Sequence, residues 1–524
     1  MTRWLFTLLL AASCCRSPAS PGPDAAWREG RFVETAPGAP RDGGTLTVRL
    51  AIEPVGLTRL HDRFAEGTMS RITVGPVYET LAGRLATSWK RDGDTLSIAL
   101  REGVTFHDGR PFTSADVKAT LETVLNASNA TAAFREELLA LESIETPDAH
   151  TVVLRWRSPG VFAEVLVLSA LPMLPAHALR GDWDTLPLHR APIGTGPFRF
   201  ERWEAGQSLS YVRADARAHL ERVVFRFVKD EVAASAAWAR GEFDVMTRIP
   251  PATWRAVESQ PWAWTQYQRV RATQPSYAWL GFNQRLPQFR DAPTRRALTL
   301  LFPAPLVDQT VTLGLEPRSS CPYFTDESCA PEVSMPGFDP ARARALLATA
   351  GWAPQADGVL ARDGVRFSFA FLVPAQSVRM AKTLPLYLDT LKAAGIDARI
   401  ETVDVSAYMS RVRPHDFEAI ALSWFSRDAL QDNFPLFHSS AREGGANYVG
   451  FSDAEVDRLL EQIRGTWDEA ERHRLEREVH RRVAAEEAYL FLGRPPELFA
   501  FKRRVHGVRL AQGWPDLSSL WVEP

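Results

Sequence analysis

The stretch Phe106–Val117, FHDGRPFTSADV, constrains the fold of this chain more than any other. Its first half, HDGRP, has the composition of a tight turn, because glycine accepts positive φ and proline presets φ at about −65°. Thr113 and Asp116 follow at the spacing of a capping box, and apolar residues then recur with the period of a helix. The sequence therefore predicts a turn and then a helix that begins at Ser114.

The residues before this turn favour a strand. Residues 95–106 read TLSIALREGVTF, in which Leu96, Ile98 and Leu100 alternate with polar or small residues. Such alternation is typical of a half-buried strand. A unit of strand, turn and helix indicates an α/β protein but does not by itself indicate a function.

Five further blocks narrow the fold. They are VYETL at 77–81, LATSW at 85–89, PIGTGPF at 192–198, YAWLGFN at 277–283 and FDPARARALLATAGW at 338–352. With the first stretch, they resemble the extracytoplasmic solute-binding proteins of ABC importers, of the oligopeptide, dipeptide and nickel type. The resemblance spans roughly Gly43 to Glu497. It implies an α/β fold, a two-lobed periplasmic-binding-protein clamp (type II, cluster C-like) with an additional α/β domain inserted in the first lobe.

The resemblance and the composition together suggest a division of the chain. We expect a signal peptide (1–13), a lipidated flexible tether (14–42), a first domain in three parts (43–65, 191–275 and 491–524), a second domain (66–190) and a third domain that forms the second lobe (276–490).

The first residues have the pattern of an export signal. After Arg3, the apolar run Trp4–Ala12 is too short to span a bilayer and fits the core of a secretory signal. LAASC, which ends at Cys14, resembles a bacterial lipobox, with Cys15 as the alternative lipidated residue. Residues 16–41 are rich in Pro, Ala, Gly and Ser, as flexible tethers are. We expect a periplasmic or extracytoplasmic protein anchored by lipid to a bacterial membrane; simple secretion and a buried N-terminal segment are the alternatives.

Charge and cysteine content exclude some functions. The 61 Lys and Arg residues nearly balance the 63 Asp and Glu residues, so we expect no nucleic-acid partner. Cys321 and Cys329 are the only cysteine pair after the N-terminal segment, and in an oxidising compartment we expect them to form a disulfide. A metal site would need more ligands than these two cysteines, and His107 and His438 are interpreted as turn or surface residues. We expect no metal and no cofactor.

Two further local patterns give boundaries in the second half of the chain. Ser452 and Glu455 have capping-box spacing before an apolar helix face. Residues 365–373, 378–394 and 395–400 read as strand, helix and strand, the parallel crossover of α/β domains.

The candidate site is residues 417–437, FEAIALSWFSRDALQDNFPLF, in which a strand through Trp424 gives way to a polar and aromatic segment. In peptide-binding members of the resembling family this segment borders the ligand, and an acidic residue three positions after the Trp pairs with the ligand's α-ammonium. When the segment is aligned without gaps on Trp424 and Asp432, the residue in that place is Arg427. If Arg427 faces the cleft, its guanidinium suits a carboxylate or phosphate, so the ligand is anionic or is a peptide bound differently. If the loop is shifted by one, Asp428 takes the acidic role; a site that uses neither residue is the third reading.

Other site residues come from the resemblance alone. It places Glu66, Gly67 and Thr68 in a first-domain loop that faces the ligand backbone, and it places Tyr277 and Asn283 at the cleft from the third domain. Each has a structural alternative, because aromatic and Asn side chains commonly serve cores and turns.

The sequence does not favour an enzyme. It contains no His-Glu-x-x-His, no Gly-x-Ser-x-Gly, no Walker loop and no dinucleotide-binding glycine pattern after a strand. The resemblance implies a monomeric clamp that closes on a peptide or small ligand and delivers it to ABC permease subunits driven by their ATPases. A sensory or scaffold lipoprotein with the same fold and an exported hydrolase are the alternatives.

Overall fold

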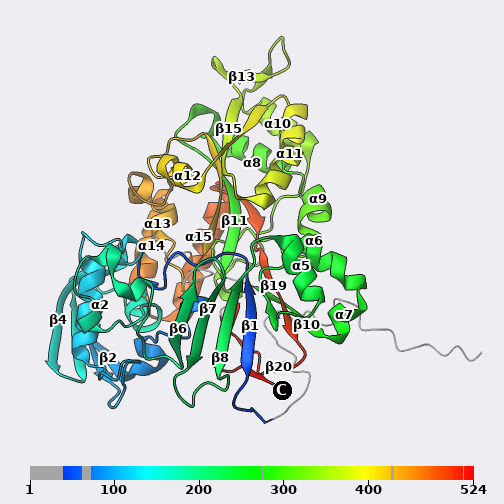
Figure 1. Ribbon diagram of the computed structural model, residues 1–524. Helices are drawn as coiled ribbons and strands as arrows, with labels where there is room; N and C mark the ends of the chain where they lie inside the picture. Colours follow the sequence, from blue (N-terminus) through cyan, green and yellow to red (C-terminus); the bar gives the residue numbers. More distant parts are fainter. Residues whose placement is uncertain (1–38, 62–71, 274, 426–429, 512, 524) are drawn as a thin grey trace, which may run out of the picture.

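The chain folds into two lobes, the lower and the upper half of Figure 1. The computed structural model describes residues 39–61, 72–273, 275–425, 430–511 and 513–523. Lobe 1 contains a seven-stranded and a four-stranded sheet, and lobe 2, residues 276–493, contains a five-stranded sheet. The predicted two-lobed α/β clamp is therefore confirmed.

The seven-stranded sheet is the centre of lobe 1. Its strands in spatial order are β10 (Tyr267–Thr273), β19 (Pro496–Lys502), β9 (Val245–Met246), β1 (Thr45–Leu50), β8 (Arg222–Phe227), β7 (Ser208–Arg213) and β6 (Phe198–Glu204). Strand β1 is parallel to β8 and β9, whereas β6 and β7 form an antiparallel hairpin. Beside β10 lie α5 (Glu231–Ala239), α6 (Pro251–Ala256) and α7 (Pro261–Thr265). Leu46, Val48 and Leu50 of β1 are fully buried, because this strand lies inside the sheet.

The four-stranded sheet forms the left part of lobe 1 in Figure 1. Its strands in spatial order are β2 (Ala86–Asp92), β3 (Thr95–Leu100), β5 (Thr151–Trp156) and β4 (Leu141–Asp148). With it lie α2 (Ser114–Leu125), α3 (Ala132–Leu138), α4 (Val161–Val165) and the π-helical turns η2 (Leu81–Leu85) and η3 (Leu166–Ala170). Helix α2 begins at Ser114 as predicted, and the Asp116 carboxylate accepts a hydrogen bond from the Thr113 amide at 2.8 Å.

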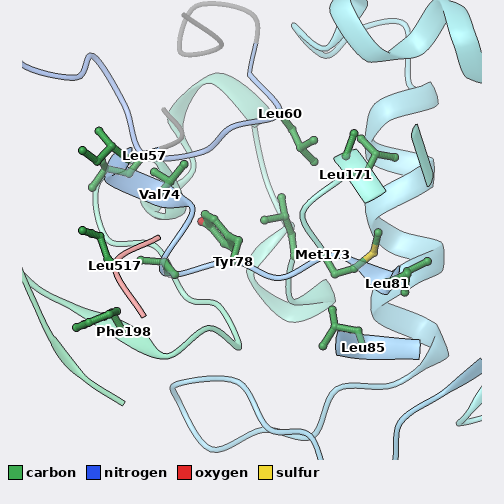
Figure 2. Close-up of a cluster of buried hydrophobic side chains, with 14 of the residues drawn as sticks. Leu57, Leu60, Val74, Tyr78, Leu81, Leu85, Leu171, Met173, Phe198 and Leu517 are labelled. Atoms are coloured by element: carbon green, nitrogen blue, oxygen red, sulfur yellow. The ribbon is translucent and has the colours of Figure 1, made fainter. Parts of the chain in front are cut away.

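One hydrophobic cluster joins both sheets of lobe 1. It contains residues of β1 and β8 as well as residues of β3 and β5. Figure 2 shows a part of this cluster in which Tyr78, Leu81 and Leu85 lie near Leu171 and Met173. Because the apolar side chains of both sheets share one core, lobe 1 is a single unit.

Three of the sequence blocks meet where the two sheets of lobe 1 join. The amide of Gly196 donates to the Val77 carbonyl at 2.8 Å, and the His107 ring nitrogen Nε2 lies 2.8 Å from the Gly196 carbonyl oxygen. A Cβ atom on Gly196 would lie 2.3 Å from the carbonyl oxygen of Pro76, and one on Gly194 would lie 1.9 Å from that of Val77. The two glycines of PIGTGPF are thus required because two backbones touch there.

Lobe 2 is built on the five-stranded sheet. Its strands in spatial order are β16 (Asp397–Val403), β15 (Ser368–Pro374), β17 (Ala419–Phe425), β11 (Ser276–Phe282) and β18 (Leu490–Gly493). One face packs on α8 (Ala292–Leu301), α9 (Ala304–Val307), α10 (Pro340–Thr349) and α11 (Val378–Ala393). The other face packs on α12 (Val405–Val412), α13 (Phe434–Phe437), α14 (Ala454–Gly465) and α15 (Glu469–Ala485). Strands β15 and β16 are parallel and joined through α11, which confirms the predicted crossover.

Short strands complete the chain. A small sheet of β12 (Ala353–Pro354), β13 (Leu360–Arg362) and β14 (Val365–Arg366) projects at the top of Figure 1. Near the C-terminus lie β20 (Val505–His506), β21 (Leu510–Ala511), β22 (Trp514–Pro515) and β23 (Trp521–Val522). In the parts of the chain that the structure describes, no helix has both the length and the apolar character needed to cross a bilayer.

Two boundaries differ from the sequence predictions. Strand β18 pairs with β11, so the sheet of lobe 2 continues past the predicted end at residue 490 to Gly493. Helix α14 is capped by Asp453 and not by Ser452: the Asp453 carboxylate accepts hydrogen bonds from the amides of Glu455 at 2.8 Å and Val456 at 3.0 Å. Both adjacent residues can act as caps, and the sequence spacing alone selected the wrong one.

Two segments cross between the lobes. One leads from Thr273 at the end of β10 to β11, and the other leads from Gly493 at the end of β18 to β19. Any movement of one lobe against the other has to bend these two connections.

Candidate functional site

A cavity of about 210 Å³ lies between the two lobes, and we call it the inter-lobe cavity. Its wall in lobe 1 is formed by Glu137 of α3, by Phe162 and Val165 of α4 and by Leu166. Its wall in lobe 2 is formed by Trp424 and Phe425 at the end of β17 and by Leu430, Gln431, Asp432 and Leu436. Its wall combines apolar side chains with the polar Glu137, Gln431 and Asp432, so the cavity offers both apolar contacts and polar partners.

Trp424 is held at the cavity wall by aromatic neighbours. Its ring stacks on Trp279 with a centroid distance of 5.8 Å and on Tyr448 with a distance of 5.7 Å. Its indole Nε1 donates to the Tyr489 hydroxyl at 3.4 Å. Position and orientation of this side chain are therefore set within lobe 2, and its contact with a ligand stays a prediction.

Asp432 also lies at the cavity wall, but its carboxylate is used within lobe 2. Oδ2 accepts hydrogen bonds from Nε of Arg464 at 2.8 Å and from Nη2 at 2.6 Å, and Oδ1 accepts one from the Phe434 amide at 2.9 Å. The Arg464 guanidinium carbon also lies 3.7 Å from the centre of the Phe434 ring. Because its charge is compensated by Arg464, Asp432 fastens the segment after β17 to α14.

Tyr277 and Asn283 are buried inside lobe 2, which corrects the expectation that they face the cleft. Tyr277 is fully buried and its ring contacts Phe324 and Phe491. The Asn283 carboxamide donates to the Phe417 carbonyl at 3.0 Å and is also almost fully buried. Tyr277 therefore packs in the core of lobe 2, and Asn283 holds two segments of the chain together by a hydrogen bond.

The remaining predicted site residues lie outside the described residues. They are Glu66, Gly67, Thr68, Arg427, Asp428 and the two N-terminal cysteines, Cys14 and Cys15. Arg427 and Asp428 stand in the sequence between Phe425 and Leu430, which both line the inter-lobe cavity. Their roles stay predictions.

The lobes touch each other next to the inter-lobe cavity. Val161 and Phe162 of α4 belong to the hydrophobic cluster of lobe 2. Arg91 of β2 forms an ion pair with Glu164 and places its guanidinium over the Trp467 ring, just after α14. Burial raises the pKa of the Glu164 carboxyl, and the nearby Arg91 opposes this rise. These contacts could not be predicted from the sequence, since no local pattern distinguishes Arg91 or Trp467.

A larger cavity of about 860 Å³ lies at the two crossing segments, and we call it the hinge cavity. Its wall includes Thr273, the last residue of β10, and Arg494, the first residue after β18. It also includes the loop closed by the disulfide between Cys321 and Cys329. The predicted disulfide is thus present. Helix α15 contributes His480 to the same wall.

The hinge cavity contains a serine next to a histidine, but the pair does not have the arrangement of a nucleophile and its base. The His480 Nδ1 atom accepts a hydrogen bond from the Ala330 amide at 3.0 Å, so the proton of the neutral ring is on Nε2. Nε2 then donates to the Ser320 hydroxyl oxygen at 3.3 Å and cannot take its proton. Burial lowers the pKa of His480 to about 4. Among the described residues, no group of His, Cys, Asp and Glu side chains could hold a metal ion either.

Comparisons with known proteins agree with this architecture. Residues 80–445 match the model of the family described as bacterial extracellular solute-binding proteins, family 5. The oligopeptide-binding protein AppA of Bacillus subtilis is 26% identical over 508 residues, which cover 90% of this chain and 90% of AppA. The structure of AppA in complex with a nonapeptide has a TM-score of 0.79 at 23% identity and covers 93% of this chain and 100% of that chain. NikA of Brucella suis in complex with Fe(III)-EDTA has a TM-score of 0.79 at 22% identity and covers 92% and 100%.

Proposed function

Because the chain belongs to family 5 of the bacterial extracellular solute-binding proteins, we propose that it is the solute-binding component of an ABC importer. It captures its ligand between the two lobes and presents the closed form to a membrane permease. The observation that carries this proposal is the inter-lobe cavity, whose walls come from both lobes. A ligand that contacts both walls stabilises the closed arrangement, because it has more contacts there than in an open one.

The proposed ligand is a peptide. AppA, with which the chain shares most of its length, is an oligopeptide-binding protein. The inter-lobe cavity of about 210 Å³ is smaller than most pockets for whole small molecules, so it accommodates one part of the ligand. Its wall combines the apolar Phe162 and Trp424 with the polar Glu137 and Gln431, which suits the mixed polar and apolar surface of a peptide.

A small anionic ligand is the second candidate, and it depends on the segment after Trp424. With Arg427 at the cleft the site would take a carboxylate or phosphate, whereas with Asp428 there it would take the α-ammonium of a peptide. Glu66, Gly67 and Thr68 are proposed to contact the ligand from lobe 1 in either case.

The proposal includes a location and partners. Residues 1–13 act as the export signal, Cys14 or else Cys15 carries the lipid, and the segment up to residue 42 tethers a monomer outside the bacterial membrane. The partners are the permease subunits and ATPases of one ABC importer.

Native mass spectrometry of the protein, purified without denaturation, tests the proposal and its two ligand classes. A peptide mass bound to the protein is the expected result, and a small acidic compound would support the second class. Trp424→Ala should lose the bound mass, whereas Trp89→Ala, which removes an exposed Trp on β2, should keep it. A protein that carries nothing and binds no member of a mixed peptide library would contradict the proposal.

A further inference from the structure

The hinge cavity is a separate place in the molecule with the size of a ligand site. Its volume of about 860 Å³ lies within the range of pockets that hold small organic molecules. Its wall includes Thr273 and Arg494 at the two crossing segments, but none of the residues that line the inter-lobe cavity. A ligand there would contact lobe 2 and the connections between the lobes.

Arg318 is the most informative residue of this wall. Its side chain is partly buried, and among the described residues its guanidinium takes part in no hydrogen bond and no ion pair. The carboxylates of Asp308 and Glu316 interact with it only at longer range, and the Glu316 carboxylate is itself bound to Arg379 Nη2 at 2.7 Å. A partly buried guanidinium with free N–H donors is suited to bind a carboxylate or phosphate group.

The other charges of the wall leave a net positive balance. Arg494 adds a second guanidinium, whose Nη2 donates to the Tyr323 carbonyl at 2.5 Å. Asp326 is the single carboxylate among the residues described in this wall. His480 is neutral near pH 7, because burial lowers its pKa to about 4. Among the lining residues two guanidinium groups stand against one carboxylate, and Asp308 and Glu316 lie only at longer range from Arg318, so the guanidinium of Arg318 is the group suited to bind an anion.

Apart from Thr273 and several serines, the remaining wall is apolar. Phe324, Met335 and the disulfide of Cys321 and Cys329 line the cavity together with several prolines. A ligand for this cavity therefore needs an apolar body as well as an anionic group. Inorganic phosphate and sulfate have no apolar body.

We propose that the hinge cavity binds an organic carboxylate, whose carboxylate group is held by Arg318 and whose apolar body lies against Phe324 and Met335. This goes beyond the proposed function, because it concerns a second site that does not use the inter-lobe cavity.

The test uses 3-phenylpropanoate and the uncharged 3-phenylpropanamide as probes in titration calorimetry on the whole mature protein. The propanoate should bind and the amide should not. Arg318→Gln should weaken propanoate binding at least about tenfold, since it removes a charged hydrogen-bond partner. Arg318→Lys should lose part of the affinity because it keeps the charge but not the fork. The matched control is Arg344→Gln on α10, an exposed position that should leave the affinity unchanged.

Hydrogen–deuterium exchange identifies the place of binding. The propanoate should protect amides within residues 317–335, and the protection should vanish in Arg318→Gln. Protection at residues 424–436 instead would put the probe in the inter-lobe cavity and overturn the proposal. Absence of binding, or equal affinity of Arg318→Gln, would also overturn it, without any consequence for cargo bound between the lobes.

Discussion

The guanidinium carbon of Arg91, on β2 of lobe 1, lies 3.0 Å from the centre of the Trp467 ring, which belongs to lobe 2. Arg91 is also paired with Glu164 of α4, so its position is fixed within its own lobe. A cation held over an aromatic ring in this way is attracted to it. The contact therefore joins the lobes at one edge of the inter-lobe cavity and stabilises their closed arrangement.

A double-mutant cycle on these two residues should reveal this coupling. Arg91→Ala and Trp467→Ala should each weaken binding of the natural cargo a few fold, with an interaction energy of about 0.5–1 kcal/mol between them. Calorimetric titration of the four proteins measures it. Lys90→Ala is the control, since Lys90 is an exposed neighbour on the same strand. Strictly additive effects would show that the contact does not contribute to closure.

Gly196→Ala should destabilise lobe 1 strongly. Its new Cβ atom would lie 2.3 Å from the Pro76 carbonyl oxygen, which belongs to backbone and cannot turn away. We expect a loss of at least about 3 kcal/mol in the free energy of unfolding, measured by denaturant titration. Gly465→Ala is the matched control: no atom lies within 4 Å of its Cβ position at the end of α14, and the change should be neutral or slightly stabilising. Equal losses of unfolding free energy at both glycines would contradict the close approach of the Gly196 and Pro76 backbones.

Local patterns predicted much of the fold because they carry their own physical cause. The helix at Ser114 follows from a capping box, and the strand–helix–strand unit of lobe 2 follows from hydrophobic periodicity. Asp453 replaced Ser452 as the cap because adjacent capping residues compete, and only the path of the chain decides between them.

The candidate site was less predictable because burial depends on residues far away in the sequence. Tyr277 and Asn283 are of types that serve either a core or a cleft, and the packing of lobe 2 buried both. Arg318 and Arg91 have no local pattern, since their surroundings are created by segments that meet only in the folded chain. Trp424 was placed at a cavity wall because a strand pattern and a family resemblance coincided there.

His480 should make the protein less stable in acid. Burial lowers its pKa in the folded state to about 4, whereas an unfolded chain has the ordinary value of about 6.5. The unfolded state therefore takes up the proton first, and stability falls as the pH drops from about 6.5 to 4, by about 3 kcal/mol in total. His480→Gln should remove this loss while a side-chain oxygen still accepts from the Ala330 amide. Urea unfolding at several pH values measures it, and parallel pH curves for both proteins would count against the prediction.

Glu497 should have the opposite effect at the second crossing segment. This residue of β19 is paired in register with Ala272 of β10, and burial raises the pKa of its carboxyl to about 7 although Arg248 lies 3.9 Å away. The folded state therefore keeps the proton longer than the unfolded state, whose ordinary value is about 4.3. Its contribution to stability is fully present below that value and is lost as the pH rises through 7, a change of roughly 3–4 kcal/mol.

Glu497→Gln should therefore become more stable relative to the wild-type protein between pH 5 and 8, as measured by urea unfolding. Glu102→Gln, at an exposed turn, should show no such trend. His480 lowers the stability of the wild-type protein toward acid, and Glu497 lowers it toward base. The stability of the two variants relative to the wild-type protein should therefore change with pH in opposite directions. If the difference in free energy of unfolding between Glu497→Gln and the wild-type protein stays constant with pH, Glu497 is ionised in the folded protein and Arg248 outweighs the burial of its carboxylate.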